Sequence, residues 1–103
     1  MAGLQLAIMT KTERNTALQQ IRDIIGENGG WITHHTLFSN LSATLNFELS
    51  SEQIPLFLSA LNLAGYTHTV ETPAKGHGDI FAQIALTFIH HEPDLKRSVP
   101  AFG

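Results

Sequence analysis

The sequence predicts a single α+β domain in which three helices pack on a C-terminal two-stranded β-hairpin, to which a short third strand could be added. Apolar residues recur at helical spacing up to about Ala64, whereas residues 66–72 are rich in aromatic and β-branched side chains and apolar residues alternate with others from Ile80 to Phe88. The chain has 103 residues, of which 43% are hydrophobic. It is therefore long enough to bury one compact core and leaves little room for a second domain.

A first helix is predicted from Thr12, which would cap it, to about Glu27. Its inward stripe repeats every three or four residues and consists of Ala17, Leu18, Ile21, Ile24 and Ile25. The run Asn28-Gly29-Gly30 is predicted to end this helix, because glycine adopts the left-handed conformation that a helix end requires.

A second helix is predicted from about His34 to Thr44, after a short extended piece at Trp31-Ile32. Thr33 would be its N-cap. Its inward face would consist of Leu37, Phe38, Leu41 and Leu45.

A third helix is predicted to begin at Ser50 or Ser51 and to run to Ala64, with Gly65 as the stop. Pro55 is compatible with this helix only in its first turn, because proline lacks the backbone N–H that residues further along a helix donate to the preceding turn.

The predicted hairpin consists of a strand from Tyr66 to Thr72, a glycine-containing turn over residues 73–79, and a strand from Ile80 to Ile89. The domain would then span residues 10–91. Residues 1–9 would form an N-terminal arm, and residues 92–103, which hold two prolines and no periodicity, a flexible tail.

This order of elements resembles that of the winged-helix (winged helix-turn-helix) superfamily. The run Leu56-Phe57-Leu58-Ser59-Ala60-Leu61-Asn62-Leu63-Ala64-Gly65-Tyr66 is similar to the end of a third helix entering the first wing strand in such proteins. The resemblance covers about Thr12 to Ile89. It implies a DNA-binding transcriptional regulator or a module that binds only protein. The DNA contacts it implies would come from Lys11, Arg14, Ser51, Ser59, Asn62, Lys75 and His77.

The charge pattern favours protein contacts over DNA contacts. From Asp23 to Ala74 the chain has no lysine or arginine, and its net charge is −3. Lysine and arginine supply most of the affinity of a protein for phosphate. We therefore expect a small regulatory protein that binds a second copy or another protein, with DNA binding by a dimer as the alternative. The expected contact residues are apolar and are Leu56, Ala60, Leu63 and Tyr66.

Other classes of function find little support in the sequence. There is no cysteine, and the six histidines lack the spacing that would converge on a metal, so we expect no metal and no cofactor.

The glycines between Lys75 and Asp79 precede a strand, which indicates a hairpin turn and not a phosphate loop. No nucleophile, base and acid are suitably spaced, so we expect no enzyme activity. No stretch is as long as a membrane span, and we expect a cytoplasmic protein.

Overall fold

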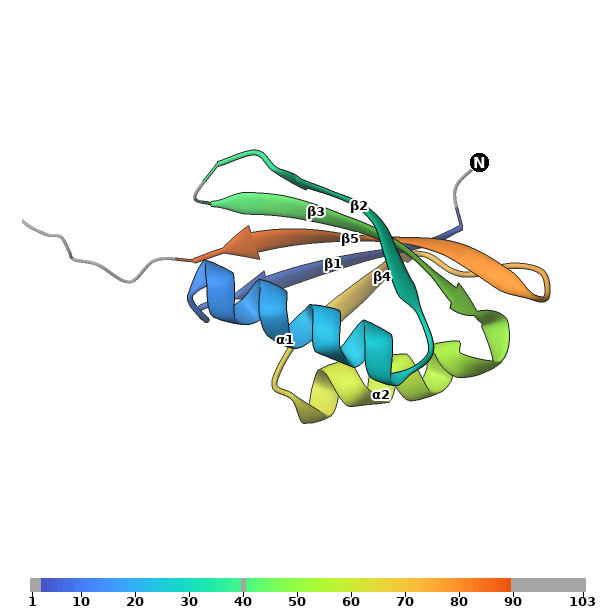
Figure 1. Cartoon of the computed structure of the whole chain (residues 1–103). Coiled ribbons are helices and arrows are strands. Elements are labelled where there is room, and N and C mark those ends of the chain that lie inside the picture. The colour runs from blue at the N-terminus through green and yellow to red at the C-terminus, as the bar shows by residue number, and fades with distance from the viewer. Residues whose placement is uncertain (1–2, 40, 90–103) are drawn as a thin grey trace, which may run out of the picture.

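The computed structural model describes residues 3–39 and 41–89, which form one five-stranded sheet and a layer of two helices. The elements in chain order are β1 (Leu4–Thr10), α1 (Arg14–Glu27), β2 (Trp31–Leu37), β3 (Ser42–Ser50), the 3-10 turn η1 (Ser51–Gln53), α2 (Ile54–Leu63), β4 (His68–Thr72) and β5 (Asp79–Phe88). Both helices lie on the same side of the sheet, so the other side is left uncovered (Figure 1).

The sheet has the strand order β2-β3-β5-β1-β4, so the last strand in the sequence lies at its centre. β5 runs parallel to β1 and antiparallel to β3, and the outer strands β2 and β4 are antiparallel to their neighbours. The parallel pair joins residues that are far apart in the sequence, such as Leu6 and Ile84. The first and last strands of the described chain therefore lie side by side in the middle of the sheet.

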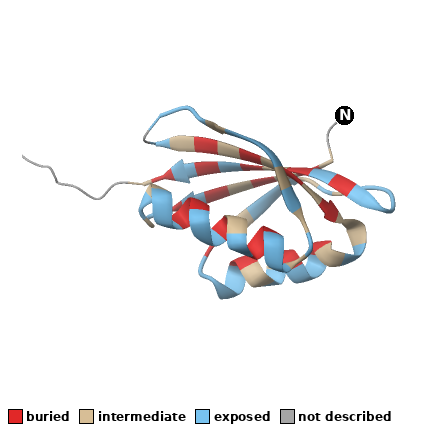
Figure 2. Ribbon diagram, viewed as in Figure 1, coloured by how far each residue is buried: buried red, intermediate tan, exposed pale blue. Residues whose placement is uncertain are grey.

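Alternation of apolar and polar residues determines which side of each strand faces the helices. In β3 the buried residues are Ala43, Leu45, Phe47 and Leu49, and every residue between them is partly exposed. β1 alternates in the same way through Leu4, Leu6 and Ile8. Because successive side chains of a strand point to opposite faces, all of these residues lie against the helix layer. Figure 2 shows the resulting bands of buried residues across the strands.

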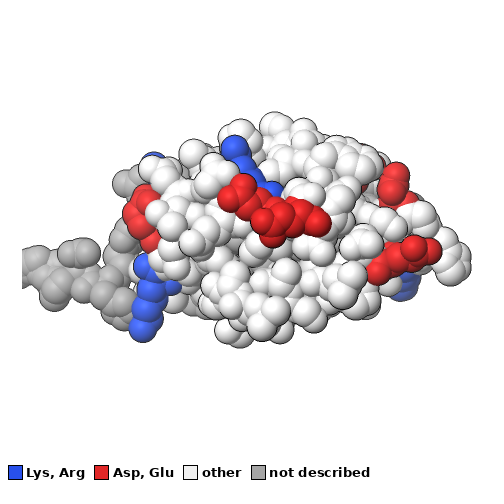
Figure 3. Space-filling view, turned by 60° about the horizontal axis from the view of Figure 1, so that its bottom comes forward, with Lys and Arg blue, Asp and Glu red and all other residues white. Residues whose placement is uncertain are grey.

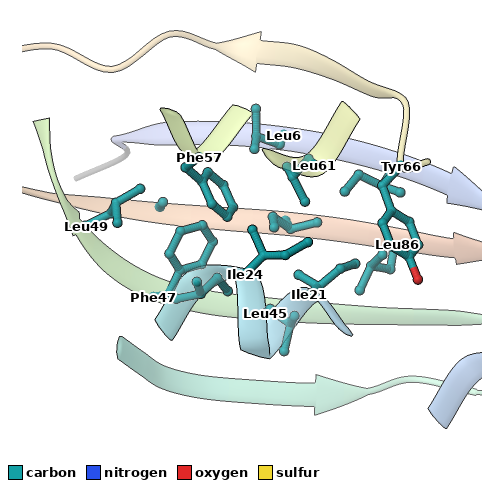
Figure 4. Close-up of a cluster of buried hydrophobic side chains, with 14 of the residues drawn as sticks. Leu6, Ile21, Ile24, Leu45, Phe47, Leu49, Phe57, Leu61, Tyr66 and Leu86 are labelled. Carbon is teal, nitrogen blue, oxygen red and sulfur yellow. The ribbon is translucent and has the colours of Figure 1, made fainter. Parts of the chain in front are cut away.

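The core lies between the sheet and the two helices (Figure 4). α1 contributes the stripe Ala17, Leu18, Ile21, Ile24 and Ile25, and α2 contributes Ile54, Phe57 and Leu61. α1 ends at Glu27, where Gly29 has a φ of 82°, and α2 is followed by Gly65 with a φ of 92°. The predicted first and third helices are thus confirmed in position, together with their glycine stops. Neither helix in the described ranges has the length and apolar character needed to cross a membrane.

The winged-helix prediction is wrong, because the described chain has two helices and five strands where three helices and a hairpin were expected. The segment predicted as a second helix, His34–Thr44, instead forms the end of β2, a turn and the start of β3. Its apparent inward residues Leu37, Phe38 and Leu41 are 48%, 66% and 53% exposed. From Ala43 to Leu49 every second residue is apolar, and this alternation is typical of the strand that the segment forms.

The predicted pairing of the last two strands is also wrong. β4 and β5 are not neighbours, because β1 lies between them and pairs with both. The segment expected to form an N-terminal arm becomes, from Leu4 onward, this strand. Its four buried residues are Leu4, Leu6, Ile8 and Thr10. The predicted tail, residues 92–103, lies outside the described residues.

Candidate association surface

The side of the sheet away from the helices is not covered by any other element of the described chain (Figure 1). Its side chains alternate with the buried ones along each strand, and we call this set the open face. The open face consists of Gln5, Ala7, Met9, Trp31, His34, Thr36, Ser42, Thr44, Asn46, Glu48, Thr69, Thr72, Asp79, Phe81, Gln83, Ala85 and Thr87.

A row of polar side chains crosses all five strands of the open face. The strand registers align His34, Asn46, Gln83, Gln5 and Thr72 side by side. Gln83 Nε2 donates a hydrogen bond to Asn46 Oδ1 at 3.2 Å, and Thr72 Oγ1 donates to Gln5 Oε1 at 3.0 Å. Because these groups satisfy part of one another's hydrogen bonding, the row can be covered at lower desolvation cost than free amides.

The neighbouring row is built from small side chains. Thr36, Thr44, Ala85, Ala7 and Thr69 lie opposite one another in the registers of the five strands. Such a row projects little from the backbone, so it leaves a low strip across the sheet. A second flat surface could approach this strip closely.

Large apolar side chains stand at both ends of the open face. Met9, Trp31 and Phe81 are 64%, 48% and 60% exposed. A hollow of about 250 Å³ lies beside Phe81, and Gly3, Thr33 and Asn46 contribute to its lining. At Gly3 a Cβ would fall 2.0 Å from the Phe81 carbonyl oxygen, so the chain approaches β5 there as only glycine can.

The open face carries almost no charge. None of the five strands described contains a lysine or an arginine. The carboxylates on the face are Glu48 and Asp79, both toward the end where β5 begins, while Glu71 lies at the register shift of β4. A sheet face in water usually carries more charged groups than this, so the composition is typical of a face that becomes covered.

The predicted protein-contact residues do not form one surface. Leu56 and Leu63 lie on the outer face of α2 and are 59% and 89% exposed. Ala60, between them, is half-buried against the core. Tyr66 is buried, and its hydroxyl donates to Gln20 Oε1. Tyr66 is therefore a core residue that joins the α2–β4 link to α1, and burial raises the pKa of its phenol.

The outer surface of the helix layer is also sparsely charged. α2 contains no charged residue along its ten positions. Figure 3, which views the molecule from below the helices, shows a few separate basic and acidic groups on a surface that is otherwise uncharged. The exposed leucines of α2, Leu56 and Leu63, form a second apolar area on a single helix.

The residues predicted to contact DNA are divided between two ends of the sheet. Ser51 donates its backbone N–H to the Gly78 carbonyl, so η1 lies beside the loop that carries Lys75 and His77. Lys11 follows β1 at the opposite end, where Thr10 pairs with Phe88. The ten residues of β5 separate these ends by roughly 30 Å. Ser59 and Asn62 are exposed on α2, on the helix side.

The titratable groups with a shifted pKa serve the fold. Glu13 caps α1 and accepts from the backbone N–H groups of Asn15 at 2.9 Å and Thr16 at 3.0 Å, which lower the pKa of its carboxyl. Thr12 was predicted in this capping role, and it lies one residue too early. Within the described ranges, no group of three His, Cys, Asp or Glu side chains is placed to hold a metal ion.

Comparisons with protein-family models, with curated proteins and with solved structures find no match for this chain. The open face itself was missed at the sequence level, because Trp31 was expected beside a helix and residues 1–9 in an arm. The alternation of Leu4, Leu6 and Ile8 with Gln5 and Ala7 is the signal that could have revealed it.

Proposed function

We propose that this chain is a non-enzymatic association domain that binds a second copy of itself through the open face. The supporting observation is a five-stranded face without lysine or arginine, bounded by Met9, Trp31 and Phe81. Covering exposed apolar side chains stabilises a complex by about 25 cal/mol per Å² of apolar area, before the costs of association.

The open face is large enough for such an interface. Five strands about 4.8 Å apart, each contributing about seven residues at 3.3 Å, cover roughly 550 Å² in projection. The relief of the side chains makes the accessible area larger than this projection. A standard interface needs about 800 Å² of accessible surface from each partner, so the open face supplies most of that area.

The distribution of charge favours a second copy as the partner. The two carboxylates of the open face, Glu48 and Asp79, lie toward one end of the strands, and Met9 lies at the other. In a two-fold packing with the sheets opposed, the acidic end of one copy can lie over the Met9 end of the other. Like charges then stay apart, and no charge of the opposite sign is needed from the partner.

Solution mass measured over a range of concentrations tests this proposal. Substitution of one residue by lysine then shows which surface forms the contact. The wild-type chain should have twice the 11.3 kDa of one copy, with little dependence on salt. Ala85 is exposed on the open face, and Ala85→Lys would put two desolvated ammonium groups into the interface, so this variant should be monomeric. The control Ser59→Lys, on the outer face of α2, should remain a dimer.

A wild-type chain that stays monomeric up to high concentration would contradict self-association. If Ser59→Lys dissociates the dimer and Ala85→Lys does not, the contact lies on the leucines of α2 and the assignment to the open face is wrong. DNA binding, the other class predicted from the sequence, stays a prediction, which the same mass measurement with added DNA fragments at low and high salt would test.

A further inference from the structure

A second cavity lies on the opposite side of the sheet, between α1 and β2. It has a volume of about 270 Å³, and we call it the α1–β2 pocket. Its lining residues are Asn15, Leu18, Gln19, Arg22, His35 and Leu37. His35 and Leu37 pair with the buried residues Leu45 and Ala43, which places them on the helix side of β2 and away from the open face. The α1–β2 pocket is thus independent of the association surface.

Arg22 is the permanently charged residue of this pocket. Its side chain is half-buried and has no ion pair within the described residues, whereas Asp23, the next residue along, accepts a hydrogen bond from Gln19. Nε is buried and makes no hydrogen bond to the described residues, so a ligand in the pocket would meet the guanidinium at its terminal Nη groups. A partly buried cation without an acceptor is unfavourable, so the pocket presents an unpaired charge to a ligand.

We propose that the α1–β2 pocket binds a small organic acid through a single carboxylate held by Arg22. The planar guanidinium matches a carboxylate, because two parallel N–H groups can donate to its two oxygens. The amides of Asn15 and Gln19 lie at the same rim and offer further polar contacts. The assignment rests on the place of Arg22 in the lining and on the lack of an ion pair to it within the described residues.

The rest of the pocket limits the ligand to a short acid with an apolar body. Leu18 and Leu37 form the apolar part of the lining, which suits an alkyl chain or a small ring. Arg22 is the only lysine or arginine in the lining, so one negative charge is matched and the multiple charges of a nucleotide are not. The volume of about 270 Å³ lies just below the 300–1,000 Å³ of common ligand sites, which favours a small ligand.

Titration of the ¹⁵N-labelled chain with hexanoate tests this site, using the Nε–H signal of Arg22 as the direct reporter. Hexanoate should shift that signal with saturation, because its carboxylate binds the same guanidinium. Hexanamide, with the same chain and no charge, should bind at least tenfold more weakly, as should inorganic phosphate, which has no apolar body. Arg22→Gln should weaken hexanoate binding by at least about tenfold.

The variant Lys11→Gln is the matched control, because it removes one exposed cation away from the pocket and should leave hexanoate affinity unchanged. Arg22→Lys keeps the charge but loses the planar fork, so it should bind hexanoate more weakly than the wild type. If the Nε–H signal of the wild-type chain does not move with hexanoate, the proposal is overturned. This result does not depend on whether the variants fold. Phosphate binding as tight as hexanoate binding would also overturn it, since the apolar walls would then play no part.

Discussion

The ring of Phe47, on β3, lies 5.3 Å from the ring of Phe57, on α2, at an interplanar angle of 59°. Both side chains are fully buried. Tilted aromatic pairs at this distance are favourable beyond the area that they bury. This contact joins α2 to β3, the strand next to the centre of the sheet, so it helps to hold α2 on the side opposite the open face (Figure 4).

Removing one of these rings should cost much of the stability of the fold. Phe57→Ala leaves a cavity against Phe47, and we expect a loss of about 3–5 kcal/mol in the free energy of unfolding. The measurement is denaturant unfolding followed by circular dichroism. Phe81→Ala is the control, because Phe81 is 60% exposed on the open face, and in the monomer it should change stability by less than about 1 kcal/mol. Equal losses in the two variants would contradict the assigned core.

Gly30 stands where the chain leaves α1 for β2 and leaves no room for a side chain. A Cβ there would lie 2.7 Å from the Glu48 carbonyl oxygen and 3.0 Å from side-chain atoms of Ile25 and Leu49. Gly30→Ala should therefore lower the free energy of unfolding by about 1–3 kcal/mol through overpacking.

Gly26 provides the matched control for this substitution. It lies in α1, and a Cβ would meet nothing within 4 Å. Gly26→Ala should raise the free energy of unfolding by about 0.5–1 kcal/mol, because alanine has the higher helix propensity. Thermal or denaturant unfolding of both variants gives the comparison, and a Gly30→Ala variant as stable as Gly26→Ala would show that β2 does not approach β3 as described.

Acid should weaken the start of α1. Glu13 accepts from the backbone N–H of Asn15 and of Thr16, and these bonds hold its pKa below the ordinary value of 4.5. Because the folded-state pKa is depressed, the stabilisation is fully present above the unfolded-state value. It is lost as pH falls through the folded-state pKa.

Glu13→Gln removes the ionised cap and so tests its contribution. The wild type should unfold at a higher temperature than this variant at pH 6, and the gap should narrow as the pH is lowered to 3. Melting curves at several pH values provide the measurement. A gap that stays constant over this range would mean that the charge of Glu13 contributes nothing to the cap.

The sequence predicted the helices better than the sheet, for a physical reason. The stripe from Ala17 to Ile25 depends on local spacing, and it was confirmed. The parallel pairing of β1 with β5 joins Leu6 to Ile84, and no local pattern records such a partner. Because residues 1–9 were predicted to form an arm, the predicted sheet lacked β1, which is the strand next to the centre of the real sheet.

The same limit applies to the candidate site. Leu56 and Leu63 were expected at the surface from their position on the helix, and both are exposed. Tyr66 was expected beside them, but it is buried against α1, because the link after α2 turns back into the core. The open face exists only through the registers of five strands, so its rows cannot be assembled before those registers are known.

The most direct test of association through the open face is the distance between spin labels in the assembled chain. The sequence has no cysteine, so Thr69→Cys, on the edge strand of the open face, and Ser59→Cys each give one labelling site per copy. Opposed sheets pack about 10 Å apart and each helix layer adds roughly 10–12 Å on its side. Labels at position 69 should therefore lie within roughly 20 Å of each other, and labels at position 59 beyond roughly 35 Å. The reverse order of distances, short at 59 and long at 69, would place the contact on α2 and contradict association through the open face.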